Sequence, residues 1–391
     1  MRWQSFVSSG ETWSAGRFSY SYDAAQQNTV VLNPFGERTT LAYDASGRPI
    51  ARRLSNGSRT SYTYDNASRR TNVDNLTSAG AAIAMFAYKY DAASNPTCLV
   101  ESSGDRVTWS YDVADRLIAE RRSGASAYAN TFTYDSVGNR TRKNANSIRT
   151  TFNYDSANQL TYSLAAAGRT TFNYDQAGNQ HIEQPPTGAR TTTTWNYENQ
   201  PSVYQLPNAT RMTLAYNADN TRVSKVTASG TTQFIWDPAS DAYQSELDGS
   251  NVTQVVYTSP PSQFGQLISQ RRSSTSRWYH PDSLGSTRAL TDSVQATTDT
   301  YLCDAWGNPL SSTGSTVNPF RWVGNVGYYF DSESGLYYIR ARVYQPTIAR
   351  WTSPDPLFYM LARYGLIGFG ARDPIGFEGR IQSLFLWGYV P

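Results

Sequence analysis

The sequence contains almost no cysteine or histidine. Its 391 residues include two cysteines, Cys98 and Cys303, and two histidines, His181 and His280. The cysteines lie about 200 residues apart and form no Cys-x-x-Cys motif, so they predict no disulfide framework. Two histidines are too few for a histidine-rich metal cluster, and each is interpreted as a packed or surface residue. The sequence therefore predicts no metal and no cofactor.

Charge and long apolar runs are also scarce. Charged residues make up 17%, and 34 basic and 31 acidic residues leave a net charge of +3. Arginine is scattered, without the dense basic stripe of a nucleic-acid-binding protein, so we expect no nucleic acid partner. No apolar stretch reaches the roughly 20 residues of a membrane helix. The N-terminal MRWQSFVSSGETWSAG has no apolar core, so no signal peptide is visible. Phosphate-binding loops and the Gly-x-Ser-x-Gly elbow of serine hydrolases are absent.

Aromatic residues and glycine are abundant instead. The chain has 28 tyrosines, 27 glycines and 14% aromatic residues. Tyrosine and threonine favour strands, whereas glycine and asparagine favour turns. Disordered chains are poor in aromatic residues. The composition therefore predicts many short strands joined by many turns.

A Tyr-Asp pair recurs along the first half of the chain, with a period near 20 residues. The copies are Tyr22-Asp23, Tyr43-Asp44, Tyr64-Asp65, Tyr90-Asp91, Tyr111-Asp112, Tyr134-Asp135, Tyr154-Asp155 and Tyr174-Asp175, with drifted copies expected at Tyr197-Glu198, Tyr216-Asn217 and Trp236-Asp237. A repeat of this length is typical of proteins built by stacking identical units.

Each unit has the pattern of a β-hairpin. A large apolar residue usually lies two positions before the tyrosine, as in Phe172 and Tyr174, which is the alternation of a half-buried strand. The aspartate and a following glycine or asparagine predict a tight turn. A second turn is expected at a glycine about 14 residues after the tyrosine, as at Asn56-Gly57.

Such hairpins are not stable alone, so we expect them to stack edge to edge. The predicted fold class is all-β: repeat hairpins winding into a spiral sheet or partial shell, followed by a small mixed, mostly β core region. The repeated tyrosines are interpreted as packing residues and the aspartates as turn caps. A carbohydrate-binding or surface-binding face made by the tyrosines is the open alternative.

The 20-residue repeat is no longer recognisable after Trp236, and a different set of sequence motifs begins at Trp278. It contains YHPDSLGST (279–287), YLCDAWGNP (301–309), FRWVG (320–324), DSESGLYYIRARVY (331–344) and RWTSPDP (350–356). Together with the Tyr-Asp array, these motifs resemble the Rhs repeat-associated core domain of Rhs, teneurin-like and ABC-toxin shell proteins. The expected domains are a YD-repeat array (1–240), a transition (241–277) and an Rhs core domain (278–391).

The resemblance implies a hollow β-shell that carries a variable, often toxic, C-terminal polypeptide. In that family an autoprotease with aspartates and a nearby arginine cuts the polypeptide free, and two carboxyl groups with different pKa values suit this chemistry. Asp355 and Arg342 match the family's second aspartate and its arginine. The position of the first aspartate is Gln345, which cannot ionise.

The sequence departs from the family pattern after residue 356. Residues 357–372 resemble an insertion or duplication before Asp373-Pro374, and no toxin region follows SLFLWGYVP (383–391).

The predicted function is a structural shell or interaction module of an Rhs-type polymorphic-toxin or cell-surface system, without its toxin. An autoproteolytic, aspartyl-type core is the alternative, and a partial copy without function of its own is a third reading. The sequence favours a non-enzymatic role. A toxin polypeptide, a shell partner or a surface carbohydrate are the expected partners, and the expected location is extracellular or at the cell surface.

Overall fold

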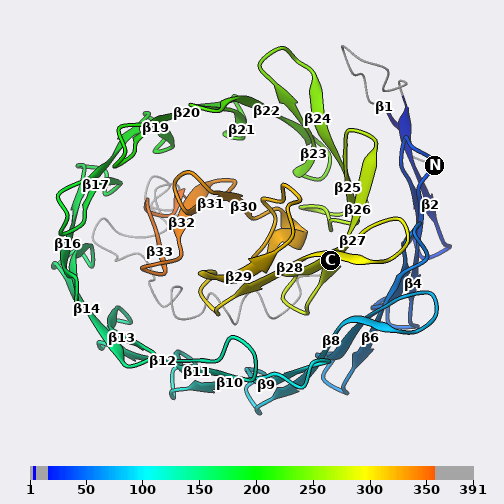
Figure 1. Ribbon diagram of the computed structural model, residues 1–391, viewed down its shortest axis with the longest axis horizontal. Coiled ribbons are helices and arrows are strands. Elements are labelled where there is room, and N and C mark those ends of the chain that lie inside the picture. The colour runs from blue at the N-terminus through cyan, green and yellow to red at the C-terminus, as the bar shows by residue number, and fades with distance from the viewer. Residues whose placement is uncertain (1–2, 6–15, 357–391) are drawn as a thin grey trace. The chain divides into compact units, whose positions relative to one another are not determined.

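The computed structural model describes residues 3–5 and 16–356 (Figure 1). These residues form two compact units. Among the described residues, unit 1 comprises 3–5, 16–89, 99–105 and 230–329, and unit 2 comprises 90–98, 106–229 and 330–356. Both are built from antiparallel strands, and the one helical turn within 16–356 is η1 (Gly324–Val326). The prediction of an all-β chain of successive hairpins is confirmed.

Unit 1 contains two runs of hairpins in which each strand pairs with the next along the chain. The first run is β1 (Trp3–Ser5), β2 (Arg17–Tyr22), β3 (Asn28–Leu32), β4 (Arg38–Tyr43), β5 (Pro49–Arg53), β6 (Arg59–Tyr64), β7 (Arg70–Leu76) and β8 (Ala82–Tyr90). The second is β22 (Gly230–Asp237), β23 (Ala242–Asp248), β24 (Thr253–Thr258), β25 (Ser269–Arg272), β26 (Thr275–Pro281), β27 (Thr287–Thr291), β28 (Thr297–Cys303) and β29 (Pro309–Thr313).

Unit 2 contains a longer run and a small separate sheet. The run is β10 (Arg106–Tyr111), β11 (Leu117–Ser123), β12 (Tyr128–Tyr134), β13 (Arg140–Ala145), β14 (Ile148–Tyr154), β15 (Leu160–Ala165), β16 (Gly168–Tyr174), β17 (Gln180–Gln184), β18 (Thr191–Trp195), β19 (Pro201–Gln205), β20 (Arg211–Tyr216) and β21 (Arg222–Thr227). The small sheet contains β31 (Leu336–Ile339), β32 (Arg342–Gln345) and β33 (Arg350–Trp351). Three strands, β8, β9 (Pro96–Glu101) and β30 (Tyr329–Asp331), have residues in both units, and β30 is the fourth strand of the small sheet.

The repeat aspartate caps the turn that follows each repeat tyrosine. In the turn after β16, one carboxylate oxygen of Asp175 accepts hydrogen bonds from the backbone N–H groups of Ala177 and Asn179, both at 2.9 Å. The backbone N–H of Gly178 donates to the carbonyl of Asp175, and Gly178 has a φ of +84°, which glycine adopts without strain. This is a type I turn followed by a left-handed residue, a common three-residue hairpin loop.

The repeat tyrosine joins each hairpin to the preceding one. Its hydroxyl donates to the backbone carbonyl of the residue six positions after the previous repeat aromatic residue. The donors Tyr43, Tyr64, Tyr111, Tyr134, Tyr154, Tyr174 and Tyr216 reach the carbonyls of Asn28, Pro49, Pro96, Leu117, Arg140, Leu160 and Pro201 at 2.7–3.1 Å. We call this contact the tyrosine latch. The repeat tyrosine therefore packs with its ring and also makes a specific hydrogen bond between consecutive hairpins of the sheet.

A second contact links consecutive turns at the rim of the sheet. The side chain four residues after the capping residue reaches the turn of the next repeat. The pairs are Arg48 with Ser68, Asn95 with Asp115, Arg116 with Asp135, Asn139 with Asn158, Asn179 with Asn199 and Gln200 with Asn220. We call this series of hydrogen bonds the rim ladder.

One drifted repeat was placed wrongly by the sequence. The expected copy at Tyr197-Glu198 lies two residues too late, because Trp195 and Asn196 take the positions of tyrosine and aspartate. The indole N–H of Trp195 donates to the carbonyl of Gln180 at 3.0 Å, as in the tyrosine latch. The amide oxygen of Asn196 accepts the backbone N–H groups of Glu198 and Gln200. Tyr197 is fully exposed at the turn.

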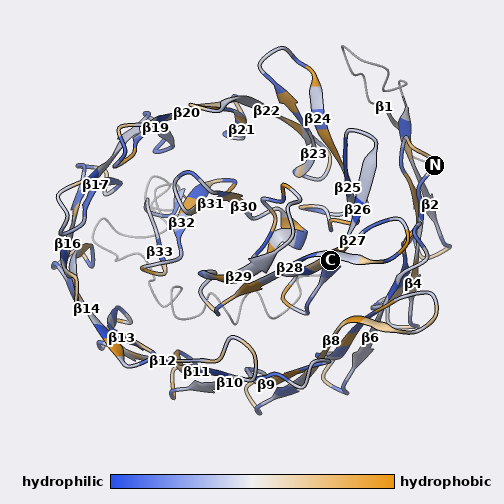
Figure 2. Ribbon diagram, in the orientation of Figure 1, coloured by the Kyte–Doolittle hydropathy of each residue, from blue (hydrophilic) through white to orange (hydrophobic). Residues whose placement is uncertain are grey.

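Each unit has its own apolar core on one face of its strands. In unit 1 the cluster is Phe18, Tyr20, Val31, Leu54, Val256, Ile268 and Trp278, so the two runs of hairpins pack against each other. In unit 2 it is Phe152, Leu160, Phe172 and Ile348, which brings residue 348 from the C-terminal part onto the array. Polar and apolar residues alternate along the strands (Figure 2), as expected for sheets with one covered face.

Candidate functional site

The small sheet of unit 2 packs onto the face of the array that carries the repeat aromatic residues. The backbone N–H of Gln180 donates to the carbonyl of Thr352 at 2.8 Å, and a guanidinium N–H of Arg350 donates to the carbonyl of Asn158 at 3.0 Å. The guanidinium of Arg350 also lies 5.1 Å from the ring centre of Tyr154. Residues 331–355 are therefore held by repeats that precede them by more than 100 residues.

A buried ionic cluster fixes the start of this segment. The side chain of Arg222 on β21 is fully buried and donates to Asp331 at 2.6 Å. Lys225 donates to Asp331 and to Glu333, both at 3.1 Å. The guanidinium of Arg222 lies 4.2 Å from the ring centre of Tyr338, whose hydroxyl accepts the backbone N–H of Arg222. Buried charges need such partners, because an unpaired ion would lose its hydration without compensation.

Two residues expected to form a catalytic site do lie together. A guanidinium N–H of Arg342 donates to Asp355 at 2.9 Å, and the two side chains are 18% and 33% exposed. The guanidinium also stacks on Trp351, 4.0 Å from its ring centre. The structure thus brings Arg342 and Asp355 into one ion pair at the end of the small sheet. A catalytic role for this pair stays a prediction.

Gln345 faces a buried carboxyl group that the sequence did not single out. Its amide N–H donates to Glu183 of β17 at 2.8 Å, and its amide oxygen accepts a hydrogen bond from Gln180 at 3.2 Å. Burial raises the pKa of Glu183, and the hydrogen bond from Gln345 acts in the opposite direction. A carboxyl group and an amide therefore meet here. An aspartate at position 345 would instead place two carboxyl groups side by side.

A signal for Glu183 was present in the repeat. The residue nine positions after each repeat tyrosine pairs across the hairpin with the residue two positions before that tyrosine, as Glu183 pairs with Phe172. Arg52, Glu120, Lys143 and Lys225 occupy the same position in other repeats. A charged residue on the covered face needs a partner, and Glu183 and Lys225 find theirs in the C-terminal segment.

The YHPDSLGST motif serves packing in unit 1. Arg288 donates to Glu101 at 2.6 Å and lies 3.5 Å from Asp282, which links β27 to β9. His280 is fully buried, and one ring nitrogen lies 2.9 Å from the hydroxyl of Thr291. Burial lowers the pKa of His280 to about 3, so the ring is neutral at physiological pH.

Within residues 3–5 and 16–356, no group of three or more His, Cys, Asp or Glu side chains is arranged to hold a metal ion. In the same part of the chain, no helix has the length and apolar character needed to cross a membrane.

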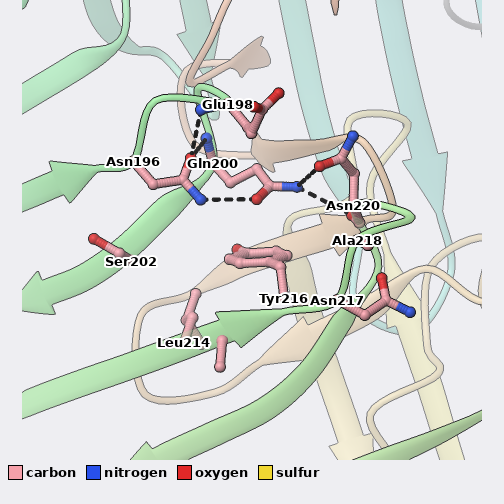
Figure 3. A pocket seen from close by; sticks show the side chains of 10 residues that line it. Asn196, Glu198, Gln200, Ser202, Leu214, Tyr216, Asn217, Ala218 and Asn220 are labelled. Carbon is pink, nitrogen blue, oxygen red and sulfur yellow. Dashed lines mark hydrogen bonds between the residues drawn. The ribbon is translucent and has the colours of Figure 1, made fainter.

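A pocket of about 440 Å³ lies between two consecutive turns of unit 2 (Figure 3). Its lining residues are Asn196, Glu198, Gln200, Ser202, Leu214, Ala215, Tyr216, Asn217, Ala218 and Asn220. The amides of Asn196, Gln200 and Asn220 are joined by hydrogen bonds, and the ring of Tyr216 lies beneath this chain in the view of Figure 3. The hydroxyl of Tyr216 is engaged in its latch to Pro201.

The capped hairpins, the tyrosine latch and the rim ladder define the class of this molecule: an antiparallel β-repeat protein in which each unit is tied to the next. The comparisons with known proteins agree. The family model described as RHS Repeat matches residues 43–82. The chain carries an RHS repeat, and its predicted resemblance to Rhs-type YD-repeat proteins is confirmed.

Relatives and solved structures match parts of larger proteins. The tRNA3(Ser)-specific nuclease WapA of Bacillus spizizenii is 34% identical over 138 residues, which is 34% of this chain and 6% of that protein. The toxin protein Tse5 of Pseudomonas aeruginosa is 35% identical over 80 residues, which is 20% of this chain and 6% of Tse5. The chain matched in the crystal structure of TcdB2-TccC3-TEV has a TM-score of 0.68 at 17% identity, over 88% of this chain and 20% of that one. This likeness shows the shared fold.

Proposed function

We propose that this chain is a wall segment of an Rhs-type shell, with a structural or interaction role in a polymorphic-toxin or cell-surface system. The repeated tyrosine latch carries this proposal. It ties each hairpin to the one before it, so the array is built as a continuous wall. The toxin protein Tse5 and the nuclease WapA among the similar proteins support the same system.

Residues 278–356 fit the role of an Rhs core domain that packs against the wall. Within unit 2, the ionic cluster at Asp331 and the contacts of Gln345 hold the segment 331–355 on the array. The same architecture suits a carried toxin polypeptide or a further shell component as partner, and an extracellular or cell-surface location. The wall role needs no bond-breaking step.

Protection of a carried polypeptide tests this proposal. A reporter polypeptide of low stability is fused in frame after the last residue, and its digestion by added protease is compared with that of the free reporter. Slower digestion, lost when the chain is first unfolded in urea, supports a shell. Equal digestion rates in the folded fusion and the free reporter contradict it.

Autoproteolysis is the second candidate, and the Arg342–Asp355 ion pair favours it. Asp355 would act as the ionisable group and Arg342 would hold its carboxylate. The amide of Gln345 stands where the resemblance expects a further aspartate, so a complete carboxyl pair is not formed at that position. The expected cut near Asp373 falls outside the described residues.

Mass spectrometry separates the two functions. An intact mass of 43.5 kDa over days at several pH values supports the wall alone. A discrete C-terminal loss that Asp355→Asn abolishes supports the protease. Arg342→Lys keeps the charge but loses the planar guanidinium, so it tests whether the geometry of the pair matters.

A further inference from the structure

In two of the repeats, an arginine from the preceding turn covers the ring of the repeat tyrosine. The guanidinium of Arg48 lies 4.6 Å from the ring centre of Tyr64, and that of Arg116 lies 4.9 Å from the ring centre of Tyr134. Both arginines are the fifth residue after the preceding repeat tyrosine. The wall therefore contains a recurrent place for a guanidinium on an aromatic face, and stacking of this kind is stabilising.

The same place holds an amide side chain in other repeats, as at Asn95, Asn139 and Asn179, and it lacks an arginine at Tyr216 as well. The fifth residue after the preceding repeat aromatic residue, Trp195, is Gln200. Its shorter side chain is 6% exposed and bonded at both ends: its oxygen accepts from Asn196 at 2.9 Å and its nitrogen donates to Asn220 at 3.1 Å. The pocket of about 440 Å³ is lined by Gln200, Tyr216 and the residues around them (Figure 3).

The charges around this pocket suit a cation. Among its ten lining residues, all in the described part of the chain, Glu198 is the one charged side chain, and it is exposed. The nearby cation Arg222 is neutralised by Asp331 at 2.6 Å and stacks on Tyr338. An aromatic ring, a carboxylate and amide oxygens together match the planar, multiply donating guanidinium better than a compact ammonium group.

We propose that this pocket, the Tyr216 seat, binds the guanidinium of an arginine side chain presented by a partner polypeptide. Gln200 fills the place that Arg48 and Arg116 take at their own tyrosines. The incoming guanidinium would therefore lie in the pocket beside Gln200, against the ring of Tyr216, and would pair with Glu198. The proposal does not depend on the shell function, because it rests on the pocket, the tyrosine ring and the carboxylate that lie together at this repeat.

Calorimetric titration of the full chain with three probes tests the seat. N-acetylarginine amide is expected to bind saturably, N-acetyllysine amide about tenfold more weakly, and the neutral isostere N-acetylcitrulline amide not measurably. An absence of saturable heat with the arginine probe overturns the proposal, and so does equal binding of the citrulline probe.

Gln200→Arg is the decisive variant. It supplies the missing guanidinium from the chain itself, and the arginines at 48 and 116 show that the fold accepts this residue at the equivalent position. The variant is expected to fold with an unchanged or higher melting temperature and to lose the arginine probe. Glu198→Gln is expected to weaken binding, and Glu183→Gln, outside the seat, to leave it unchanged. Undiminished binding by folded Gln200→Arg rejects the seat.

Discussion

At the scale of single residues, the capping position of the hairpin turn accepts more than one type of side chain. Aspartate and asparagine perform the same backbone capping, since Asp175 and Asn196 each accept two N–H groups of their turns. The Tyr-Asp signature therefore tolerates other residues at both positions. It is the oxygen at the cap that the hairpin requires, which is why Trp195-Asn196 can replace the usual pair.

Substitutions at Asp175 test this requirement. Asp175→Ala removes the acceptor of two backbone hydrogen bonds and is expected to cost about 1–2 kcal/mol of unfolding free energy. Asp175→Asn keeps the acceptor and is expected to cost clearly less. Urea denaturation followed by tryptophan fluorescence measures both. Equal losses would show that the charge, and not the acceptor, stabilises the turn.

Glu183 should make the stability of the folded chain depend on pH, in a direction that follows from its raised pKa. Burial raises its folded pKa above the unfolded value near 4.5, so the folded state binds the proton more tightly. Its contribution to stability therefore rises as pH falls through the folded pKa towards 4.5. Glu183→Gln keeps an oxygen that can accept from Gln345 and removes the buried charge, so we expect higher stability than wild type at neutral pH.

The quantity to measure is the difference in stability between wild type and Glu183→Gln as a function of pH. Thermal denaturation of wild type and Glu183→Gln should converge as the buffer is taken from pH 7 to pH 4.5. The capping aspartates are present in both proteins and cancel. A difference that stays constant over this range would mean that Glu183 is not perturbed by burial.

At the scale of elements, the small sheet β31–β33 depends on polar contacts as much as on apolar packing. Asp331 is the common partner of Arg222 and Lys225, both of which are buried. Asp331→Asn removes the carboxylate that pairs with Arg222 and leaves Lys225 with Glu333, and it is expected to cost about 3–5 kcal/mol. The loss should be local: faster amide exchange in β31 and β32, and faster tryptic cleavage at Arg340 and Arg342.

Glu333→Gln is the matched control. Glu333 also receives a hydrogen bond from Lys225, but its side chain is 28% exposed, so its loss is expected to cost less than about 1 kcal/mol. Equal exchange rates in the Asp331→Asn and Glu333→Gln variants would show that the ionic cluster does not hold the sheet.

Sequence reasoning reached the local structure and missed most of the contacts between distant segments. The roles of Tyr174, Asp175 and Gly178 could be predicted from the sequence, because strand alternation and turn chemistry depend on only a few neighbouring residues. The ion pair of Arg342 and Asp355 was expected only through family resemblance. Glu183 and Asp331 were not identified, because their partners lie 162 and 109 residues away in the chain. The repeat period does not specify which charged side chain on the covered face pairs with which distant segment of the chain.

At the scale of the whole molecule, the fold is shared far beyond the range of sequence identity. The likeness to the TcdB2-TccC3-TEV chain covers 88% of this chain at 17% identity, whereas the similarity to the WapA nuclease covers 34%. A hairpin repeat needs only alternation, a cap and a latch in each unit, so most positions can change. Strands continue through residues 241–277, and the domain boundaries drawn there from the sequence stay a prediction.

The tyrosine latch also gives the wall a mechanical character. Each latch fastens one hairpin to the backbone of its predecessor, so a pull on the chain ends should detach hairpins one after another. With about 20 residues per repeat and at most about 3.6 Å per extended residue, each event should release roughly 70 Å of length. Optical-tweezer traces should then show a ladder of similar steps. Replacing Tyr174 by phenylalanine should lower the force of the step at its own repeat and leave distant steps unchanged.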